Sequence, residues 1–162
     1  MQRIDQIISS DTVAKVFELY RDTSNVVEID GHLADRHFPS GIGHFMVSKF
    51  TNDEFDFLWK EVSSKLPGYE LVYCRVLKFI KGCYIDSHID SYTQGDQESN
   101  HSLIVQICRP ESYAGGLPSV NDETHFLKLK DALLYRYDEE HAVTPIRKGI
   151  RYVVNLRLKV AK

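Results

Sequence analysis

Apolar residues recur at helical spacing in a first segment near the N-terminus, about residues 10–20. Val13, Val16, Phe17 and Tyr20 are three or four positions apart, with polar residues between them. Residues with this spacing fall on one side of an α-helix. The pattern therefore predicts an amphipathic helix here.

A second helical pattern follows the sequence TNDE, residues 51–54. Thr51 can cap the helix while Glu54 reaches back to the backbone of Thr51, as in a capping box. The apolar residues that follow on one helical face are Phe55, Leu58, Trp59, Val62 and Leu66. Pro67-Gly68 predicts the end of this helix.

The sequence pattern changes after Gly68, from apolar residues at helical spacing to short segments rich in β-branched and aromatic residues. These segments are YELVYCRVLKFI, HSLIVQIC, HFLKLK, ALLYRY and RYVVNLRLKV. An earlier segment, HFMVSKF, also alternates as a strand does. Turn signals separate the later segments, including Lys81-Gly82 and Lys148-Gly149. The order predicts an α+β fold whose main body is an antiparallel sandwich or barrel. We expect a single domain over residues 1–162, with a helical part at about 1–68 and a β-barrel core at about 69–160.

Composition and charge exclude several classes of protein. The 162 residues are 43% hydrophobic and 27% charged, which is ordinary for a soluble globular domain. The net charge of −3 offers no overall basic field for nucleic acid. No apolar run is long enough for a membrane span, and the N-terminus lacks signal-peptide features. Three widely spaced cysteines argue against a disulfide framework, so we expect a cytoplasmic protein. These features do not indicate an oligomeric state.

The sequence YIDSHIDSY contains a candidate metal site. His88 and Asp90 are two residues apart, so in a strand both would point to the same side. They would supply two thirds of a facial triad of two histidines and a carboxylate. The protein has seven histidines. His141 differs from the others because a turn, a glycine and the strand that begins at Arg151 follow it.

Arg151 is a candidate anion-binding residue. If its side chain projects into a barrel, its buried charge is costly without an anionic partner. A guanidinium group binds a carboxylate through two parallel hydrogen bonds. The segment therefore predicts that a carboxylate ligand pairs with Arg151.

Five motifs in order, over about residues 70–158, resemble the iron(II)- and 2-oxoglutarate-dependent dioxygenases, and most closely their prolyl-hydroxylase-like branch. An aromatic residue and a glycine, Phe79 and Gly82, precede the H-x-D pair. A glycine pair, a D-A-L-L-[FY] strand and an H-x-x-x-P-[VI]-x-x-G-x-[RK] segment follow it. Their residues here are Gly115-Gly116, Asp131 to Tyr135, and His141, Pro145, Ile146, Gly149 and Arg151.

The resemblance implies a double-stranded β-helix, the jelly-roll barrel of this superfamily. It implies that His88, Asp90 and His141 hold Fe(II) and that the far carboxylate of 2-oxoglutarate pairs with Arg151. Oxygen would bind at the remaining open position. Succinate and CO2 would form while a C–H bond is hydroxylated. A carboxylate at position 90 favours hydroxylation over halogenation.

Further contacts to the cosubstrate and substrate stay open in the sequence. Many relatives hold the cosubstrate with a tyrosine on the strand before the glycine pair, where this protein has Gln106 and Cys108. Gln106 and Tyr73 are the candidates for that role. Arg75, on the same strand parity as Tyr73, is a candidate for binding an acidic group of the substrate.

The leading functional hypothesis is a hydroxylase acting on an amino acid, either free or within a peptide. A nucleic-acid dealkylating dioxygenase is one alternative, because RYVVNLR faintly resembles the R-x-N-x-[TS]-x-R signature of those enzymes. The acidic net charge counts against nucleic acid. A non-catalytic binding module on the same barrel is the other alternative. We expect polar loops at about residues 30–44 and 91–100 to roof the pocket.

Overall fold

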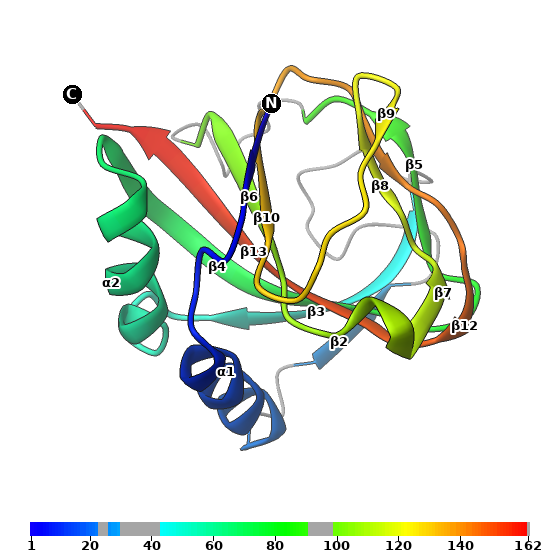
Figure 1. Cartoon of the computed structure of the whole chain (residues 1–162), viewed down its shortest axis with the longest axis horizontal. Coiled ribbons are helices and arrows are strands. Elements are labelled where there is room, and N and C mark those ends of the chain that lie inside the picture. The colour runs from blue at the N-terminus through cyan, green and yellow to red at the C-terminus, as the bar shows by residue number, and fades with distance from the viewer. Residues whose placement is uncertain (23–25, 30–42, 91–98, 162) are drawn as a thin grey trace.

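The structure is a computed structural model that describes residues 1–22, 26–29, 43–90 and 99–161 (Figure 1). Its main sheet has eleven strands among these residues, in the order β1-β10-β6-β13-β4-β3-β5-β11-β8-β9, with β2 paired to β3. A two-stranded ribbon of β7 and β12 lies beside this sheet. The strands are β1 (Gln2–Ile4), β2 (Val26–Ile29), β3 (Gly43–Phe50), β4 (Tyr69–Phe79), β5 (Tyr84–His88), β6 (His101–Gln106), β7 (Tyr113–Gly115), β8 (Pro118–Val120), β9 (Glu123–Thr124), β10 (Ala132–Arg136), β11 (His141–Val143), β12 (Ile146–Gly149) and β13 (Arg151–Val160).

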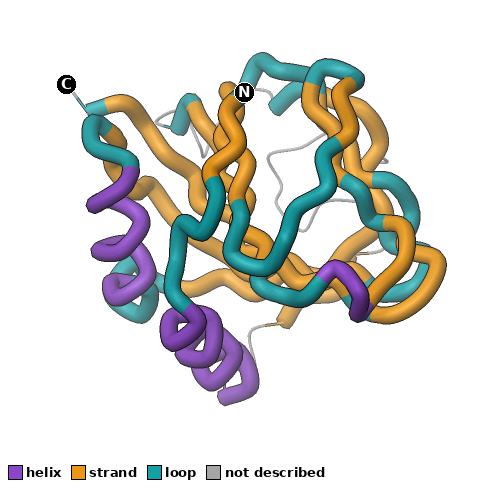
Figure 2. The backbone as a smooth tube through the Cα atoms, in the orientation of Figure 1, coloured by secondary structure: helices purple, strands orange, loops and turns teal. Residues whose placement is uncertain are grey.

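Two α-helices, α1 (Ser10–Asp22) and α2 (Asp56–Lys65), pack against one side of the large sheet (Figure 2). Both helices that the sequence predicts are therefore confirmed. The reciprocal bonds between Thr51 and Glu54 are present, with the Thr51 amide donating to Glu54 Oε2 over 2.7 Å. They close a turn just before α2, because the helix itself begins only at Asp56. Neither described helix is both long and apolar enough to cross a membrane.

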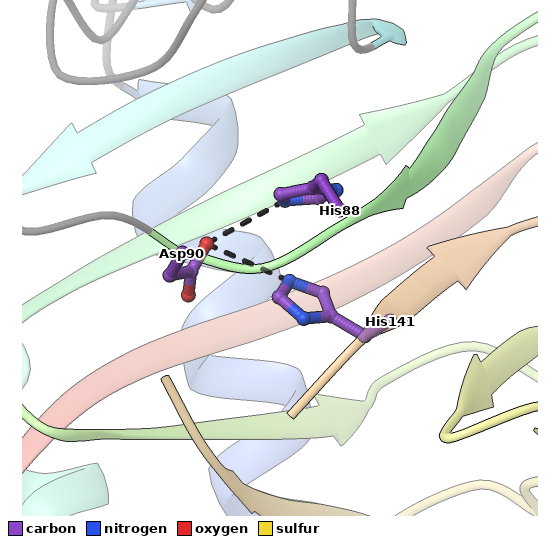
Figure 3. A group of neighbouring side chains, drawn as sticks. All are labelled: His88, Asp90 and His141. Atoms are coloured by element: carbon purple, nitrogen blue, oxygen red, sulfur yellow. Dashed lines mark ion pairs between the residues drawn. The ribbon is translucent and has the colours of Figure 1, made fainter. Parts of the chain in front are cut away.

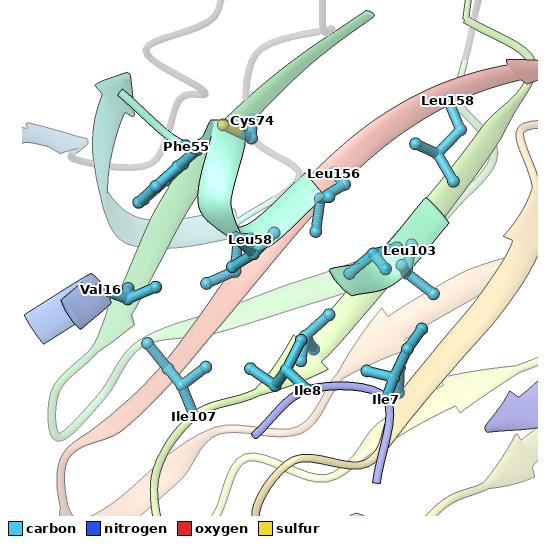
Figure 4. Packing of buried hydrophobic residues seen from close by; sticks show 14 of the residues in the cluster. Ile7, Ile8, Val16, Phe55, Leu58, Cys74, Leu103, Ile107, Leu156 and Leu158 are labelled. Carbon is cyan, nitrogen blue, oxygen red and sulfur yellow. The ribbon is translucent and has the colours of Figure 1, made fainter. Parts of the chain in front are cut away.

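The larger hydrophobic core lies between the helices and the sheet (Figure 4). Val16 of α1 and Leu58 of α2 pack there against apolar residues of β4, β6 and β13. The sheet residues of this core include Cys74, Val76, Leu103, Val105, Val154, Leu156 and Leu158. Burial of these side chains is the main force that holds the helices on the sheet.

The strands β4 and β13 form the longest antiparallel pair and have chemically different faces. Val154 and Leu156 of β13 face the helices, whereas Asn155 faces the interior of the barrel. Asn155 is paired with Arg75 across the two strands, and Arg151 is paired with Phe79. The alternation of side chains along a strand thus separates an apolar core from a polar pocket.

Most predicted strands are present, and the α+β class is confirmed. The predicted strand HFLKLK is wrong, because residues 125–130 form a loop between β9 and β10. His125 and Leu127 are buried in alternation, but no described strand forms a ladder with this segment. Its backbone amides form individual hydrogen bonds instead, and the Lys128 amide, for example, donates to the Asp131 carboxylate. The alternation of apolar and polar residues therefore predicted correctly which side chains are buried here, but it did not predict whether the segment pairs with another strand.

The first 68 residues contribute strands as well as helices. β3 lies between β4 and β5 and connects the two parts of the main sheet. The sheet thus begins before residue 69, where the sequence analysis placed the start of the barrel core. The expected pocket loops fall largely in residues 30–42 and 91–98, which lie outside the described residues.

Candidate active site

His88, Asp90 and His141 lie together at the ends of two paired strands (Figure 3). His88 ends β5 and is the direct antiparallel partner of His141, which begins β11. Asp90 follows β5, and its Oδ1 atom is 3.5 Å from His88 Nε2 and 3.6 Å from His141 Nε2. One atom from each side chain thus lies within 4.8 Å of the other two. This pattern of two imidazoles and one carboxylate can surround a single metal ion.

The two imidazole rings are held in the orientation that a metal ligand requires. His88 Nδ1 is 2.8 Å from the carbonyl oxygen of Asp86, and His141 Nδ1 is 2.9 Å from that of Glu139. Because a carbonyl oxygen only accepts, each Nδ1 carries the hydrogen and each neutral ring keeps a lone pair on Nε2. Backbone partners of this kind fix the tautomer of metal-binding histidines.

The Asp90 carboxylate has a different neighbour on each side. Its Oδ1 faces the two histidines, whereas its Oδ2 accepts a hydrogen bond from Nη1 of Arg157. Burial raises the pKa of Asp90, but the two histidines and Arg157 outweigh burial, so the pKa lies well below its usual value. Asp90 is therefore an anion in the folded protein, with one oxygen directed toward the candidate metal position.

Arg157 is a site residue that the sequence reasoning did not assign. Its side chain is almost fully buried, and Nη1 also donates to Ser102 Oγ over 2.7 Å while Nε donates to Ser99 Oγ. The only sequence signal was the faint likeness of RYVVNLR to the dealkylase signature, which placed two arginines six residues apart. The pairing of β13 with β6 sets Arg157 opposite Ser102, and its contact with Asp90 joins residues that are 67 positions apart in the sequence.

Arg151 lies at the other end of the pocket-facing side of β13 and is 1% exposed. Its Nε donates to Gln106 Oε1 over 3.1 Å, and its guanidinium carbon is 5.4 Å from the centre of the Phe79 ring. Burial lowers the pKa of Arg151 from its usual value, and the nearby Tyr113 and Cys108 oppose this shift. Its buried Nη2 atom has no hydrogen-bond partner among the described residues. An unsatisfied buried guanidinium nitrogen points to a ligand acceptor.

The surroundings of Arg151 include one residue that the sequence reasoning missed. Tyr113 lies on β7, and its hydroxyl accepts a hydrogen bond from Gln106 Nε2 over 3.1 Å. Gln106 therefore bridges Arg151 and Tyr113, and burial raises the pKa of the tyrosine. Gly116 is required beside this group, because a Cβ atom there would be 2.3 Å from Ile146 and 3.3 Å from Arg151.

One pocket connects the candidate metal position with Arg151. Its polar and charged lining residues are Arg75, His88, Asp90, Ser102, Ser119, His141, Arg151, Asn155 and Arg157. Arg75 thus faces the same pocket as the triad. Of the two candidates for a further cosubstrate contact, Gln106 touches Arg151 and lies behind it, and neither Gln106 nor Tyr73 lines the pocket.

Three solved structures have folds similar to that of this protein. An oxidoreductase of the 2OG-Fe(II) oxygenase family from Burkholderia pseudomallei aligns with a TM-score of 0.70 at 12% identity, over 96% of this protein and 83% of its own length. A collagen prolyl hydroxylase of Paramecium bursaria Chlorella virus-1, solved with 2OG, aligns with a TM-score of 0.70 at 14% identity. The alignment covers 99% of this protein and 96% of the viral enzyme. A prolyl-4-hydroxylase from Pseudomonas putida aligns with a TM-score of 0.70 at 15% identity, over 99% of this protein and 92% of its own length.

These similarities confirm the predicted fold. The antiparallel sheets form the double-stranded β-helix of 2-oxoglutarate oxygenases, with two helices on one side. No protein-family model matches the sequence, and no curated protein matches it either.

Proposed function

We propose that this protein is an iron(II)- and 2-oxoglutarate-dependent dioxygenase that hydroxylates a C–H bond of an amino acid, free or within a peptide. The observation that carries the proposal is the convergence of His88, Asp90 and His141 in one pocket with the buried Arg151. The fold shared with 2OG-Fe(II) oxygenases supports the same chemistry. The free thiols of Cys74 and Cys108 suit the reducing cytoplasm expected from the sequence.

The donor set fits Fe(II) and does not fit Mg(II). Two neutral imidazoles and one carboxylate on one side of an ion leave other positions open, which is the pattern of non-haem Fe(II) oxygenases. Magnesium prefers oxygen ligands throughout, whereas catalytic zinc sites can use the same three donors, so the choice of iron over zinc rests on the fold shared with 2OG-Fe(II) oxygenases. When bound, iron would supply the oxygen chemistry, with 2-oxoglutarate as the reductant that leaves as succinate and CO2.

Arg151 would hold the distal carboxylate of 2-oxoglutarate. Its Nε is occupied by Gln106, so the guanidinium is fixed and its Nη2 is presented to the pocket. A carboxylate there would satisfy the buried nitrogen and neutralise the buried charge. Gln106 would act by orienting Arg151, and Tyr113 would extend that hydrogen-bond network.

The other residues of the pocket would position groups and exclude water. The backbone carbonyls of residues 86 and 139 keep each histidine lone pair aimed inward. Arg157 would hold the second oxygen of Asp90, which leaves Oδ1 as the single carboxylate donor. Apolar residues such as Leu77 and Val153 separate the Arg151 end of the pocket from solvent.

A nucleic-acid dealkylase is the second candidate, and one observation favours it. Arg151, Asn155 and Arg157 of the tail RYVVNLR all line the pocket, as its likeness to the dealkylase signature requires. The net charge of −3 opposes a nucleic-acid surface.

Succinate release tests the proposal. Protein purified without oxygen and loaded with Fe(II) is supplied with 2-oxoglutarate, O2 and panels of amino acids, peptides and methylated oligonucleotides. We expect succinate release that an amino acid or peptide increases, with a gain of one oxygen in its mass. Release stimulated only by methylated oligonucleotides would identify the dealkylase. Absence of release with iron and 2-oxoglutarate both bound would leave the non-catalytic binding module.

A further inference from the structure

We propose that the Tyr135 hydroxyl donates a hydrogen bond to the near carboxylate of 2-oxoglutarate, the one beside the keto group. This inference rests on the proposed function and deepens it, because it assigns a second protein contact to the cosubstrate. Arg151 would hold the far carboxylate, and Tyr135 would require a carboxylate at the other end of the molecule. The two contacts together would select 2-oxo acids over simple ketones.

Tyr135 lies at the metal end of the pocket. It belongs to β10, its side chain is 7% exposed, and it lines the pocket that also contains the triad and Arg151. The centre of its ring is 4.7 Å from the centre of the His141 ring, and the two rings are tilted by 45°. The negative charge of Asp90 raises the pKa of Tyr135, so the phenol is also close to that carboxylate. Tyr135 therefore adjoins two of the three candidate metal ligands.

The neighbours of the Tyr135 hydroxyl set the direction of its own hydrogen. Tyr135 and Arg157 are both paired with Ser102, one on each side of β6. Ser102 Oγ accepts a hydrogen bond from Arg157 Nη1 over 2.7 Å. A hydrogen bond with Ser102 lowers the pKa of Tyr135, as donation to the phenolic oxygen does. Because a hydroxyl accepts and donates at the same time, Tyr135 can direct its own hydrogen to an acceptor in the pocket.

The phenol is a neutral donor in this place. An unperturbed tyrosine keeps its proton at neutral pH, and burial is the largest cause of the raised pKa of Tyr135. Its hydrogen can therefore be donated without bringing a further charge into the pocket. A hydrogen bond to an ionised acceptor is stronger than one between neutral groups, so a carboxylate is a well-matched partner.

The two carboxylates of 2-oxoglutarate match the two ends of the pocket. Arg151 offers its Nη2 at one end, and the triad lies at the other. A molecule held at its far carboxylate by Arg151 would bring its keto group and near carboxylate to the metal end. Tyr135 is the only tyrosine among the described residues that line this pocket, so a single substitution isolates its hydroxyl.

Paired ligands test this contact. 4-Oxopentanoate has the keto group and the far carboxylate of 2-oxoglutarate but carries a methyl group in place of the near carboxylate. Both ligands are titrated by calorimetry onto Mn(II)-loaded protein without oxygen, and 4-oxopentanoate is measured by competition where it binds weakly. We expect Tyr135→Phe to bind 2-oxoglutarate roughly tenfold more weakly, the value of one hydrogen bond to a charged acceptor. The affinity for 4-oxopentanoate should stay the same.

Control variants separate this effect from a general disturbance of the pocket. Tyr135→Phe keeps the ring beside His141, so its Mn(II) content and thermal unfolding should match those of the unaltered protein. Arg151→Ala should weaken the binding of both ligands. Tyr69→Phe should change neither, because Tyr69 packs beside His101 outside the pocket.

Two results would overturn the proposal. One is an equal affinity for 2-oxoglutarate in Tyr135→Phe and the unaltered protein, and the other is an equal loss of affinity for both ligands in that variant. Failure of the unaltered, metal-loaded protein to bind 2-oxoglutarate at all would instead overturn the proposed function.

Discussion

The two faces of the β4–β13 pair are both buried but have opposite chemistry. On the helix side, Val76, Val154 and Leu156 are at most 1% exposed and belong to the larger hydrophobic core. On the pocket side, Arg75 and Arg157 are 5% and 4% exposed on the same two strands. Apolar burial stabilises the fold, whereas buried charges cost stability unless each is paired. The helix face is thus held by apolar packing, whereas the pocket face holds its charged groups through specific contacts such as Arg157 with Asp90 and Arg75 with Asn155.

The first prediction concerns a substitution at the metal end of the pocket face, and it has the largest expected effect. His141→Ala removes one of two imidazole donors and should reduce iron binding and succinate release to background, because two ligands hold Fe(II) weakly. Iron content is measured by elemental analysis and turnover by succinate release. His101→Ala is the control, because that histidine bonds Asn100 outside the pocket. Full activity in His141→Ala would refute the assignment of the triad.

The second prediction concerns a substitution in the apolar core on the helix face. Leu156→Ala leaves a cavity under α2 and should lower the free energy of unfolding by about 2–5 kcal/mol. Chemical denaturation measures the loss. The affinity for 2-oxoglutarate of the protein that remains folded should be unchanged, because Leu156 points away from the pocket. A large change in that affinity with little loss of stability would mean that the two faces are not independent.

The third prediction concerns the other end of the pocket face. Arg151→Ala should raise the KM for 2-oxoglutarate by the equivalent of about 2–4 kcal/mol, while iron content stays nearly the same. Arg151→Lys keeps the charge but loses the two-pronged geometry, so its KM should be intermediate. Titration of 2-oxoglutarate with parallel iron analysis distinguishes these effects. An unaltered KM in Arg151→Ala would assign the distal carboxylate to a different residue.

The fourth and smallest effect is expected at Arg157. Arg157→Met removes the partner of Asp90 Oδ2 but keeps much of the side-chain volume. Loss of a group that holds a metal ligand typically weakens metal affinity by about 10- to 100-fold. Iron titration should show this, with a much smaller change in the KM for 2-oxoglutarate than in Arg151→Ala. Equal iron affinity in the unaltered and Arg157→Met proteins would reduce Arg157 to a packing role.

Local sequence patterns located both helices, most of the long strands and the residue types of the candidate site. Helical spacing located α1 and α2, and β-branched segments located strands such as β4 and β13. Local spacing was sufficient because the period of apolar residues reflects which face of an element is buried. The same local rule failed for residues 125–130, where alternation occurs without a partner strand among the described residues.

The contacts between residues far apart in the sequence depend on the tertiary structure. The pairing of β5 with β11 brings His88 opposite His141, although 53 positions of sequence separate them. The pairing of β13 with β6 brings Gln106 close to Arg151, and the folding of the whole barrel brings Arg157 to Asp90. It also places Tyr113 behind Gln106 and turns Arg75 toward the pocket. Sequence spacing cannot supply these contacts, because strand order and register depend on the packing of the whole sheet against its helices.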